Sequence, residues 1–420
     1  MTQAETPVRR PGPTAAPLLR NRDFLVFWAA QALSALGSSF SLVAMPLLVL
    51  HATGSVAQMG LITGVAGAGT VATGLFAGIL VDRYDRRRLM ITCDVARLLL
   101  YGAVPVVWWI AGELVWVLYP IMAMAAVFQM VFDVGCSAAV PSLVAREQIT
   151  SANSRLEATY AIGFVLGPMA AGLVASLLGP VTAVTFDALT FGVSAAGLLM
   201  IRLRPAVPDT AAPAAGPRSV WRDLVVGLRF LWRTPVLRAI TLLYTPVTFL
   251  SLGLVDVFIY YVRHDLGQGD RVVGTLLGAA STGAIVAALV TPAARRRLGF
   301  GPAWLTAYLA CGVAIAAAGF VFHLAVVLVA ATVFAFGETM AGISSASLRQ
   351  TVTPDHLLGR VTSAFWMVHH AFGPLGALVL TAVVARTGVR GPLVAVGVLF
   401  VVIVCAGLAT PVRSRHAVPG

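Results

Sequence analysis

The sequence has no lysine and little charge of either sign. Charged residues make up 11% of its 420 residues, whereas a soluble domain averages about 25%. A charged side chain at the centre of a bilayer costs about 2.5–3.5 kcal/mol on insertion scales, so such depletion is typical of a membrane-spanning chain. The mean hydropathy of +0.89 fits the same surroundings.

Motifs that would indicate an enzyme or an ATP-driven machine are also missing. There is no G-x-x-x-x-G-K-[ST], no H-E-x-x-H, no G-x-S-x-G in a catalytic context and no Cys/His cluster. Each of the four cysteines lies in an apolar run without C-x-x-C spacing, which is typical of small core residues. We therefore expect no enzyme activity, no cofactor, no metal and no use of ATP.

What the sequence does contain is a series of long apolar segments. A helix needs about 20 apolar residues to cross a hydrocarbon core of about 30 Å. Backbone polar groups in lipid must be satisfied within the segment, so these segments are predicted to be helices. Twelve qualify, approximately 24–50, 59–81, 89–111, 114–138, 158–178, 181–201, 236–262, 272–293, 303–320, 324–346, 361–385 and 392–410.

The arginines indicate how these helices are oriented. Of the 29 basic residues, 24 fall on one side of the predicted membrane, including Arg349 after the tenth helix, and only Arg97 is embedded. The positive-inside rule places that side in the cytoplasm. Both termini are then cytoplasmic, in the inner membrane of a bacterium. Because the arginines follow the membrane and form no soluble basic face, the high pI does not predict nucleic-acid binding.

A polar segment divides the helices into two sets of six. We predict an N-terminal bundle over residues 1–204, a cytoplasmic linker over 205–235 and a C-terminal bundle over 236–420. The linker begins rich in proline and alanine. Its second part, Val220–Trp232, gathers apolar residues on one helical face and predicts an amphipathic helix at the membrane surface, with a soluble linker helix as the alternative.

The loop after the second helix carries the sharpest motif of the chain. It begins at Gly78, places Asp82 at the membrane edge and continues with Arg83, Arg86 and Arg87. The glycine allows close backbone approach, and the arginines could hold the partner bundle by charge-assisted hydrogen bonds. The alternative is a merely basic cytoplasmic loop.

This loop resembles the GxxxDRxGRR signature of the major facilitator superfamily, with Asp85 where glycine is usual. That departure is common in the branch of twelve-helix drug and siderophore exporters related to macrolide efflux proteins and the enterobactin exporter. Further matches to this branch include Asn21–Phe24, Thr53–Ser55 and Gly359–Val361. The resemblance implies an all-α membrane protein with the major facilitator fold, two pseudo-symmetric six-helix bundles and proton-coupled efflux. It implies no particular substrate.

Small residues recur at helix-packing spacing in the second, fifth and eighth helices. The pairs are Gly60 and Gly64, Gly74 and Gly78, Gly163 and Gly167, and Gly274 and Gly278. Such pairs let helices approach and slide. In this fold, helices 2, 5, 8 and 11 would form the moving seams between the bundles; generic packing is the alternative.

Four intramembrane ionisable residues suit a structural role. Asp94 and Arg97 are three residues apart, share a helix face and can neutralise each other. Asp133 near the cytoplasmic end of the fourth helix and Asp187 in the sixth are likewise expected to be structural charges.

Four others are candidates for proton coupling. Glu338 lies well inside the tenth helix with no arginine near it in sequence, and a lone buried carboxyl group can bind and release a proton. Asp256 in the seventh helix is a second candidate. His369 and His370 lie near the middle of the eleventh helix, where the alternative is a hydrogen-bonded structural histidine.

Polar stripes on the first and seventh helices predict a central cavity. The stripes are Gln31, Ser34, Ser38 and Ser41, and Thr241, Thr245 and Thr248. Trp28, Phe249 and Phe336 could add apolar contacts, although aromatics in such helices are more often plain packing. A weakly polar cavity with a few acids suits a lipophilic or cationic compound.

These features favour a proton-driven exporter of a small lipophilic compound, such as an antibiotic or siderophore, working as a monomer by alternating access. An alternative of the same fold is a lysophospholipid flippase or an importer. A remote alternative is a non-transporting membrane receptor or scaffold, which would need large extramembrane domains.

Overall fold

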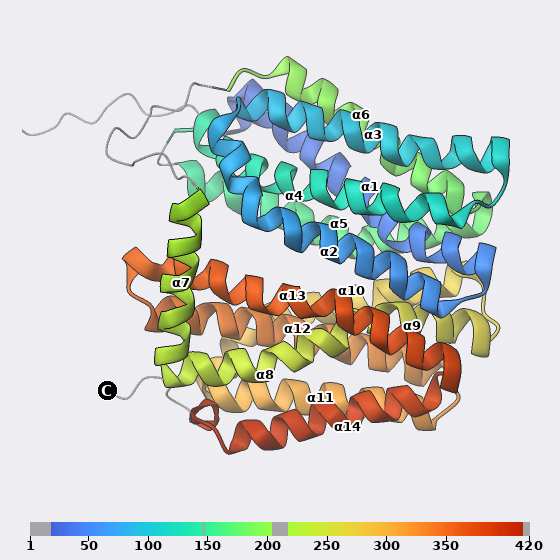
Figure 1. The fold of residues 1–420 in the computed structure, drawn as a ribbon, viewed down its shortest axis with the longest axis vertical. Helices are drawn as coiled ribbons and strands as arrows, with labels where there is room; N and C mark the ends of the chain where they lie inside the picture. The colour runs from blue at the N-terminus through green and yellow to red at the C-terminus, as the bar shows by residue number, and fades with distance from the viewer. Residues whose placement is uncertain (1–17, 146–147, 204–216, 415–420) are drawn as a thin grey trace, which may run out of the picture.

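The computed structural model describes residues 18–145, 148–203 and 217–414, and these form helices throughout, joined by short turns (Figure 1). The α-helices are α1 (Arg22–Thr53), α2 (Val56–Arg83), α3 (Arg86–Ala111), α4 (Leu118–Leu143), α5 (Ile149–Leu178), α6 (Pro180–Met200), α7 (Pro217–Arg233), α8 (Pro235–Ser251), α9 (Leu254–Tyr260), α10 (Asp270–Leu298), α11 (Phe300–Phe320), α12 (Leu324–Val352), α13 (Asp355–Thr387) and α14 (Arg390–Leu408). Short 3₁₀ turns are η1 (Leu18–Arg20), η2 (Val115–Val117) and η5 (Pro411–Arg413), and η4 (Tyr261–Asp265) is a π-helical turn.

Eleven segments of the described chain are long and apolar enough to cross a membrane. The fifth predicted span corresponds to α5, which is 30 residues long and is apolar over Leu166–Leu178. The helices extend beyond the predicted ends, and several arginines lie inside them, among them Arg155 in α5 and Arg349 in α12. The prediction that Arg349 follows the tenth helix is therefore wrong, because polar residues continue that helix past the apolar run.

The helices form two bundles, an N-terminal half (α1–α6) and a C-terminal half (α8–α14), drawn one above the other in Figure 1. We call the end of the molecule where the described chain begins and stops the terminal end, and the opposite end the far end. The halves meet mainly where α2 packs on α13 and α5 packs on α10. The sequence predicted these four helices, its numbers 2, 11, 5 and 8, as the seams.

Cap residues explain several matches to the family pattern. Asn21 caps α1 by accepting a hydrogen bond from Phe24 N, and its side-chain amide donates to Leu143 O at the end of α4 (2.8 Å). Gly54 ends α1 in the left-handed region (φ 62°), where a side chain would be strained. Asp85 caps α3 by accepting from Arg88 N (2.8 Å), which gives aspartate a function at a position where glycine is usual.

The sequence predicted the seventh span as one continuous helix, and the structure shows that it is divided. It consists of α8, a turn at residues 252–253, α9 and the π-helical turn η4. Pro246 removes one backbone donor inside α8. At the turn, α8 and α13 pack backbone against backbone, since a Cβ on Gly376 would lie 1.6 Å from Phe249 O. The turn at residues 252–253 and the π-helical turn η4 both lie in the part of this span that leads to the far end.

The predicted linker helix is present as α7, which runs across the terminal end roughly perpendicular to the spans (Figure 1). It packs on α13, where the Arg360 guanidinium pairs with Asp223 (3.0 Å). A Cβ on Gly227 would lie 2.2 Å from Arg360 O, so the two backbones are close. The proline-rich part of the linker, residues 204–216, falls outside the described residues.

Candidate functional site

The two halves touch closely toward the far end and less so toward the terminal end. A Cβ on Gly172 of α5 would lie 2.3 Å from the Cα of Gly274 of α10, so these backbones cross in contact. On α2, Gly60 and Gly64 similarly meet α13, whereas Gly78, nearer the terminal end, has no neighbour within 4 Å of an added Cβ. The glycine seams therefore close the far end.

Between the halves at the terminal end lies a cavity of about 800 Å³, which we call the inter-half cavity. Its walls come from α2 and α4 on one side and from α7 and α13 on the other. Gly74 and Gly78 lie on its α2 wall, and Trp366 and His370 on its α13 wall, with their rings stacked 5.1 Å apart. The linker helix contributes Asp223 and Leu224 to the same cavity.

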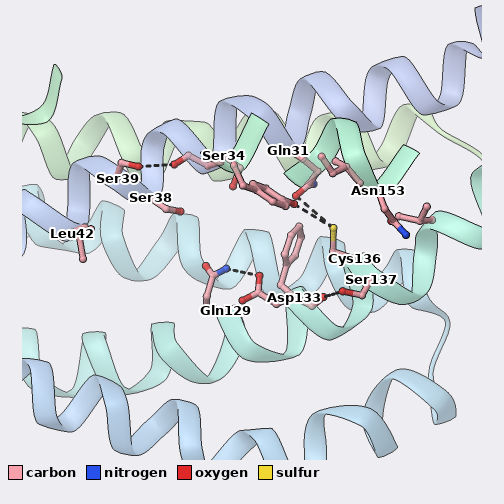
Figure 2. Close-up of a pocket in the computed structure, with 15 residues that line it drawn as sticks. Gln31, Ser34, Ser38, Ser39, Leu42, Gln129, Asp133, Cys136, Ser137 and Asn153 are labelled. Atoms are coloured by element: carbon pink, nitrogen blue, oxygen red, sulfur yellow. Dashed lines mark hydrogen bonds between the residues drawn. The ribbon is translucent and has the colours of Figure 1, made fainter. Parts of the chain in front are cut away.

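A second cavity of about 480 Å³ lies within the N-terminal half and is shown in Figure 2. We call it the α1–α4 cavity, because most of its lining comes from these two helices, with Asn153, Leu156 and Tyr160 added by α5. Gln31, Ser34 and Ser38 of the predicted stripe line it; Ser41 does not and is buried. Figure 2 shows Gln129 and Asp133 of α4 opposite the serines of α1. The cavity is thus polar on two facing walls.

A chain of charged and amide groups leads from the core to this cavity. The expected Asp94–Arg97 ion pair is present and fully buried. The Arg97 guanidinium lies between the rings of Phe132 (4.4 Å) and Phe191 (4.2 Å) and donates to Gln129 Oε1. Gln129 in turn donates to Asp133 Oδ1 (2.7 Å). Because Asp94 neutralises Arg97, the exposed Asp133 carboxylate is left as a net negative charge on the cavity wall.

The two predicted coupling acids occupy different surroundings. Glu338 is half-buried on α12, and its carboxylate accepts from Ser251 Oγ (3.3 Å) at the end of α8. Asp256 is buried on α9 beside Thr63 of the opposite half. Neither forms an ion pair among the described residues, so each is a carboxyl group without a compensating cation.

The two histidines of α13 also differ. His370 is exposed and lines the inter-half cavity, whereas His369 is fully buried in the C-terminal half. The ring of His369 packs 4.9 Å from Tyr244 and 3.8 Å from Phe365. Adjacent residues on a helix point in different directions, so His370 lines the cavity and His369 lies in the core. The sequence analysis treated the two histidines alike.

Several predicted cavity residues line neither cavity. Trp28 donates from Nε1 to Thr159 Oγ1 (2.8 Å), and Phe336 packs in a small cluster with Met340. Phe249 packs its backbone against Gly376. The hydroxyls of the predicted α8 stripe, Thr241, Thr245 and Thr248, each donate to a carbonyl one turn back in their own helix. The sequence predicted that this stripe faces a cavity, whereas its hydroxyls form hydrogen bonds with backbone carbonyls of their own helix.

The arginines of the loop motif bind their own half. Arg86 donates to Ala138 O (3.0 Å) near the end of α4, and Arg87 donates to Leu198 O and Leu199 O (2.7 and 2.6 Å) near the end of α6. Cations at helix C-termini are favourable because carbonyls there lack partners. The expectation that these arginines hold the partner half is not met in this conformation. Arg83 is exposed, and the Asp82 side chain lies outside what the structure describes.

Two features escaped sequence reasoning. At the far end His51 of α1 meets Arg263 and Asp270 of the other half, and both lie more than 200 positions from His51 in sequence. In α12 the Arg349 side chain is 3% exposed and stacks 3.8 Å over the Phe365 ring, so Arg97 is not the sole embedded arginine. The positive-inside rule hides such a residue, because it assigns arginines near span ends to loops.

Comparison with known proteins agrees with this architecture. The profile of the Major Facilitator Superfamily matches residues 27–377. The chain is 30% identical over 381 residues to "Multidrug efflux pump Tap" of Mycolicibacterium fortuitum, covering 88% of this chain and 91% of the relative. It is 26% identical over 381 residues to "Enterobactin exporter EntS" of Escherichia coli O1:K1 / APEC, covering 86% of each. A crystal structure of the nucleoside transporter NupG superimposes with a TM-score of 0.77 at 12% identity, covering 92% of this chain and 98% of that one, which shows the fold alone.

Proposed function

Since this chain belongs to the major facilitator superfamily and is a multi-pass membrane transporter rather than an enzyme, we propose that it exports a small lipophilic compound, cationic or neutral, in exchange for protons. The proposal rests on one observation above all. Both halves contribute a carboxylate that has no compensating cation and is not fully buried, Asp133 on the α1–α4 cavity and Glu338 beside Ser251, and the C-terminal half adds the buried Asp256. Ionisable groups are expensive within a membrane and mark ion or substrate pathways.

The two acids suit different roles. Asp133 faces a cavity lined by amide, hydroxyl and apolar groups, which fits a compound with one positive or hydrogen-bonding group and an apolar body. Glu338 has only hydroxyl partners, those of Ser251 and Tyr308, so it can bind and release a proton as its surroundings change. The names of the curated relatives, a multidrug efflux pump and an enterobactin exporter, support export and small organic cargo.

The direction of transport follows from the arginine distribution and the shape of the molecule. We place the terminal end in the cytoplasm on the positive-inside rule. In this conformation the inter-half cavity lies at that end while the seams close the far end. Substrate would then load from the cytoplasm or inner leaflet, and rocking of the halves would open the far end. Proton uptake at Glu338 would favour the return.

Transport into everted membrane vesicles tests the proposal. With radiolabelled tetraphenylphosphonium, a lipophilic cation, as probe and the membrane potential clamped, an acid vesicle interior should drive uptake. Glu338→Gln should abolish gradient-driven uptake, while Glu113→Gln, on the exposed far-end loop, serves as the matched control and should transport normally. Uptake that persists after a protonophore collapses the gradient would remove proton coupling, and normal uptake by Glu338→Gln would remove this residue from the mechanism.

A further inference from the structure

Buried polar atoms without hydrogen-bond partners concentrate in one part of the C-terminal half. Of the fourteen such side-chain atoms among the described residues, eight belong to α11, α12, α13 and the turn between α12 and α13. They are Trp304 Nε1, Tyr308 Oη, Ser344 Oγ, Ser345 Oγ, Arg349 Nε and Nη1, Thr353 Oγ1 and His369 Nε2. Each unpaired buried group costs about 1–3 kcal/mol, so a cluster of them indicates ordered water between them.

Aromatic contacts make this cluster continuous with Glu338. The Tyr308 hydroxyl lies next to the Glu338 carboxyl. The Tyr308 ring is 6.3 Å from that of Tyr244, which packs edge-on against His369 at 4.9 Å. Phe365 lies between His369 and the Arg349 guanidinium, 3.8 Å from each. Neighbouring groups therefore lead from the coupling acid to the buried arginine without passing through either cavity.

The helix geometry of α12 gives this path a direction. Ser345 and Arg349 follow Glu338 by seven and eleven residues, which places all three within about 20° of one face at 3.6 residues per turn. At about 1.5 Å per residue, Arg349 lies about 16 Å closer to the terminal end than Glu338. The path runs along the membrane normal, parallel to the helix and toward the terminal end.

His369 is built to accept a proton on this path. Its Nδ1 faces the Phe365 carbonyl, which can only accept, so Nδ1 carries the proton of the neutral ring. Its Nε2 is then an acceptor, fully buried and without a hydrogen bond, although the Thr241 backbone also lies beside the ring. The titratable and charged groups facing it are Tyr244 from α8 and Arg349 from α12, with His370 adjacent on α13, and Tyr308 from α11 lies behind Tyr244.

Arg349 is the unusual member of the cluster. A buried guanidinium normally has a carboxylate partner, yet Arg349 stacks on Phe365 and Trp366 and pairs with no acid among the described residues. A fixed positive charge close to His369 disfavours an excess proton that stays on the imidazole. It therefore speeds release toward the terminal end and opposes proton storage midway.

We propose that Glu338, Tyr308, Tyr244, His369 and Arg349, which we call the C-half relay, form a hydrated proton exit separate from the substrate cavities, with His369 as the transfer residue. Glu338 gives up its proton and becomes a carboxylate, and each tyrosine hydroxyl accepts one proton as it donates another. His369 Nε2 accepts the proton and passes it to water near Arg349, so the tyrosines and His369 regain their protonation states and Glu338 stays a carboxylate until it takes up the next proton. The inference rests on the proposed proton coupling, and it explains how a proton can leave while substrate occupies the cavity.

The experiment compares net transport with exchange. His369→Phe keeps an aromatic ring between Tyr244 and Phe365 but removes the acceptor. In everted vesicles it should lower uptake of tetraphenylphosphonium driven by a pH gradient at least tenfold. Counterflow of labelled against unlabelled probe without a gradient needs no proton release and should stay within twofold of wild type. His264→Phe, an exposed far-end histidine, is the control and should match wild type in both assays.

The outcomes separate the relay from the proposed function. If His369→Phe lowers gradient-driven uptake and counterflow equally, His369 has a structural role. If it lowers neither, His369 has no role in transport. Either result overturns the relay. Gradient-independent uptake by the wild type instead overturns the proposed coupling. If His369→Phe does not fold, Tyr244→Phe serves, with the same split expected. An electron-microscopy map of the wild type that resolves ordered water tests the relay without any substrate: water between His369 Nε2 and Arg349 supports it, and a dry gap there overturns it.

Discussion

Removing the His51 side chain should shift the molecule toward opening at the far end. Arg263 Nη2 lies 2.8 Å from His51 Nε2, and arginine has only donors, so the neutral imidazole accepts this hydrogen bond. His51 belongs to the N-terminal half, whereas Arg263 and Asp270 belong to the C-terminal half. Arg263 Nε also donates to Asp270 Oδ1 (3.1 Å) within the C-terminal half. His51→Ala therefore removes the hydrogen bond between the halves and leaves the Arg263–Asp270 ion pair intact.

The size of the effect follows from this geometry. A hydrogen bond to a charged group contributes about 1.5–3 kcal/mol when well shielded. His51 is 31% exposed and Arg263 26%, so water weakens the contact, and we take about 1.5 kcal/mol. No charge is left unpaired, because Arg263 keeps Asp270. Since about 1.4 kcal/mol is a factor of ten in an equilibrium constant, the far-open population should rise about tenfold.

Distances between spin labels measure this population. One label replaces Glu113 and the other Thr387, exposed far-end residues of opposite halves, in a Cys405→Ala background because the other three cysteines are buried. His51→Ala should enlarge the long-distance fraction about tenfold. His264→Ala, whose partner Asp265 is its neighbour in the same half, should leave it unchanged. A long-distance fraction in His51→Ala equal to that of the control would refute the reasoning.

Three further changes test other parts of the structure. Gly172→Val places a side chain where a Cβ would be 2.3 Å from the Gly274 Cα, so the far end should fail to close, and the same labels should report the long distance as the major species. Asp133→Asn removes the unpaired charge of the α1–α4 cavity, and the KM for tetraphenylphosphonium should rise about tenfold, or about 1.4 kcal/mol, with little loss of thermal stability; an unchanged KM argues against contact with the cation. Arg97→Met strands the buried Asp94 carboxylate and should destabilise the protein by about 3–5 kcal/mol in thermal unfolding, whereas Asp94→Asn combined with Arg97→Met should restore most of that loss; no recovery would contradict the pairing.

Most of the fold was predictable because the bilayer imposes simple rules on sequence. Apolar length predicts the spans, and the motif at Gly78 through Arg87 indicates the family. The ends of α5 and α12 were missed because helix continues through polar residues where it leaves the apolar core. The division of the seventh span was missed because proline and glycine inside an apolar run do not say whether a helix kinks or breaks there.

The candidate site was predictable only where neighbours in sequence are neighbours in space. The Asp94–Arg97 pair follows from spacing on one helix, and the stripe Gln31, Ser34 and Ser38 follows from helical period. The contact of His51 with Asp270 joins residues 219 positions apart and leaves no local pattern. The burial of Arg349 depends on Phe365 of another helix, which a single sequence does not reveal.

The two ends of the molecule differ in how the halves are joined, and this explains the conformation. At the far end, glycines let backbones of α5 and α10 touch, and tight contacts of this kind are either made or lost. At the terminal end, Arg86 and Arg87 bind carbonyls of their own half. To join the halves there, these arginines would first have to release α4 and α6. Closing the terminal end therefore costs contacts within the N-terminal half as well as the contacts of the far-end seam.

A ligand can drive such a change only by binding one state better than the other. Substrate contacts must therefore strengthen as the terminal end closes, and Asp133, the unpaired carboxylate on the wall of the α1–α4 cavity, is placed to provide one of them.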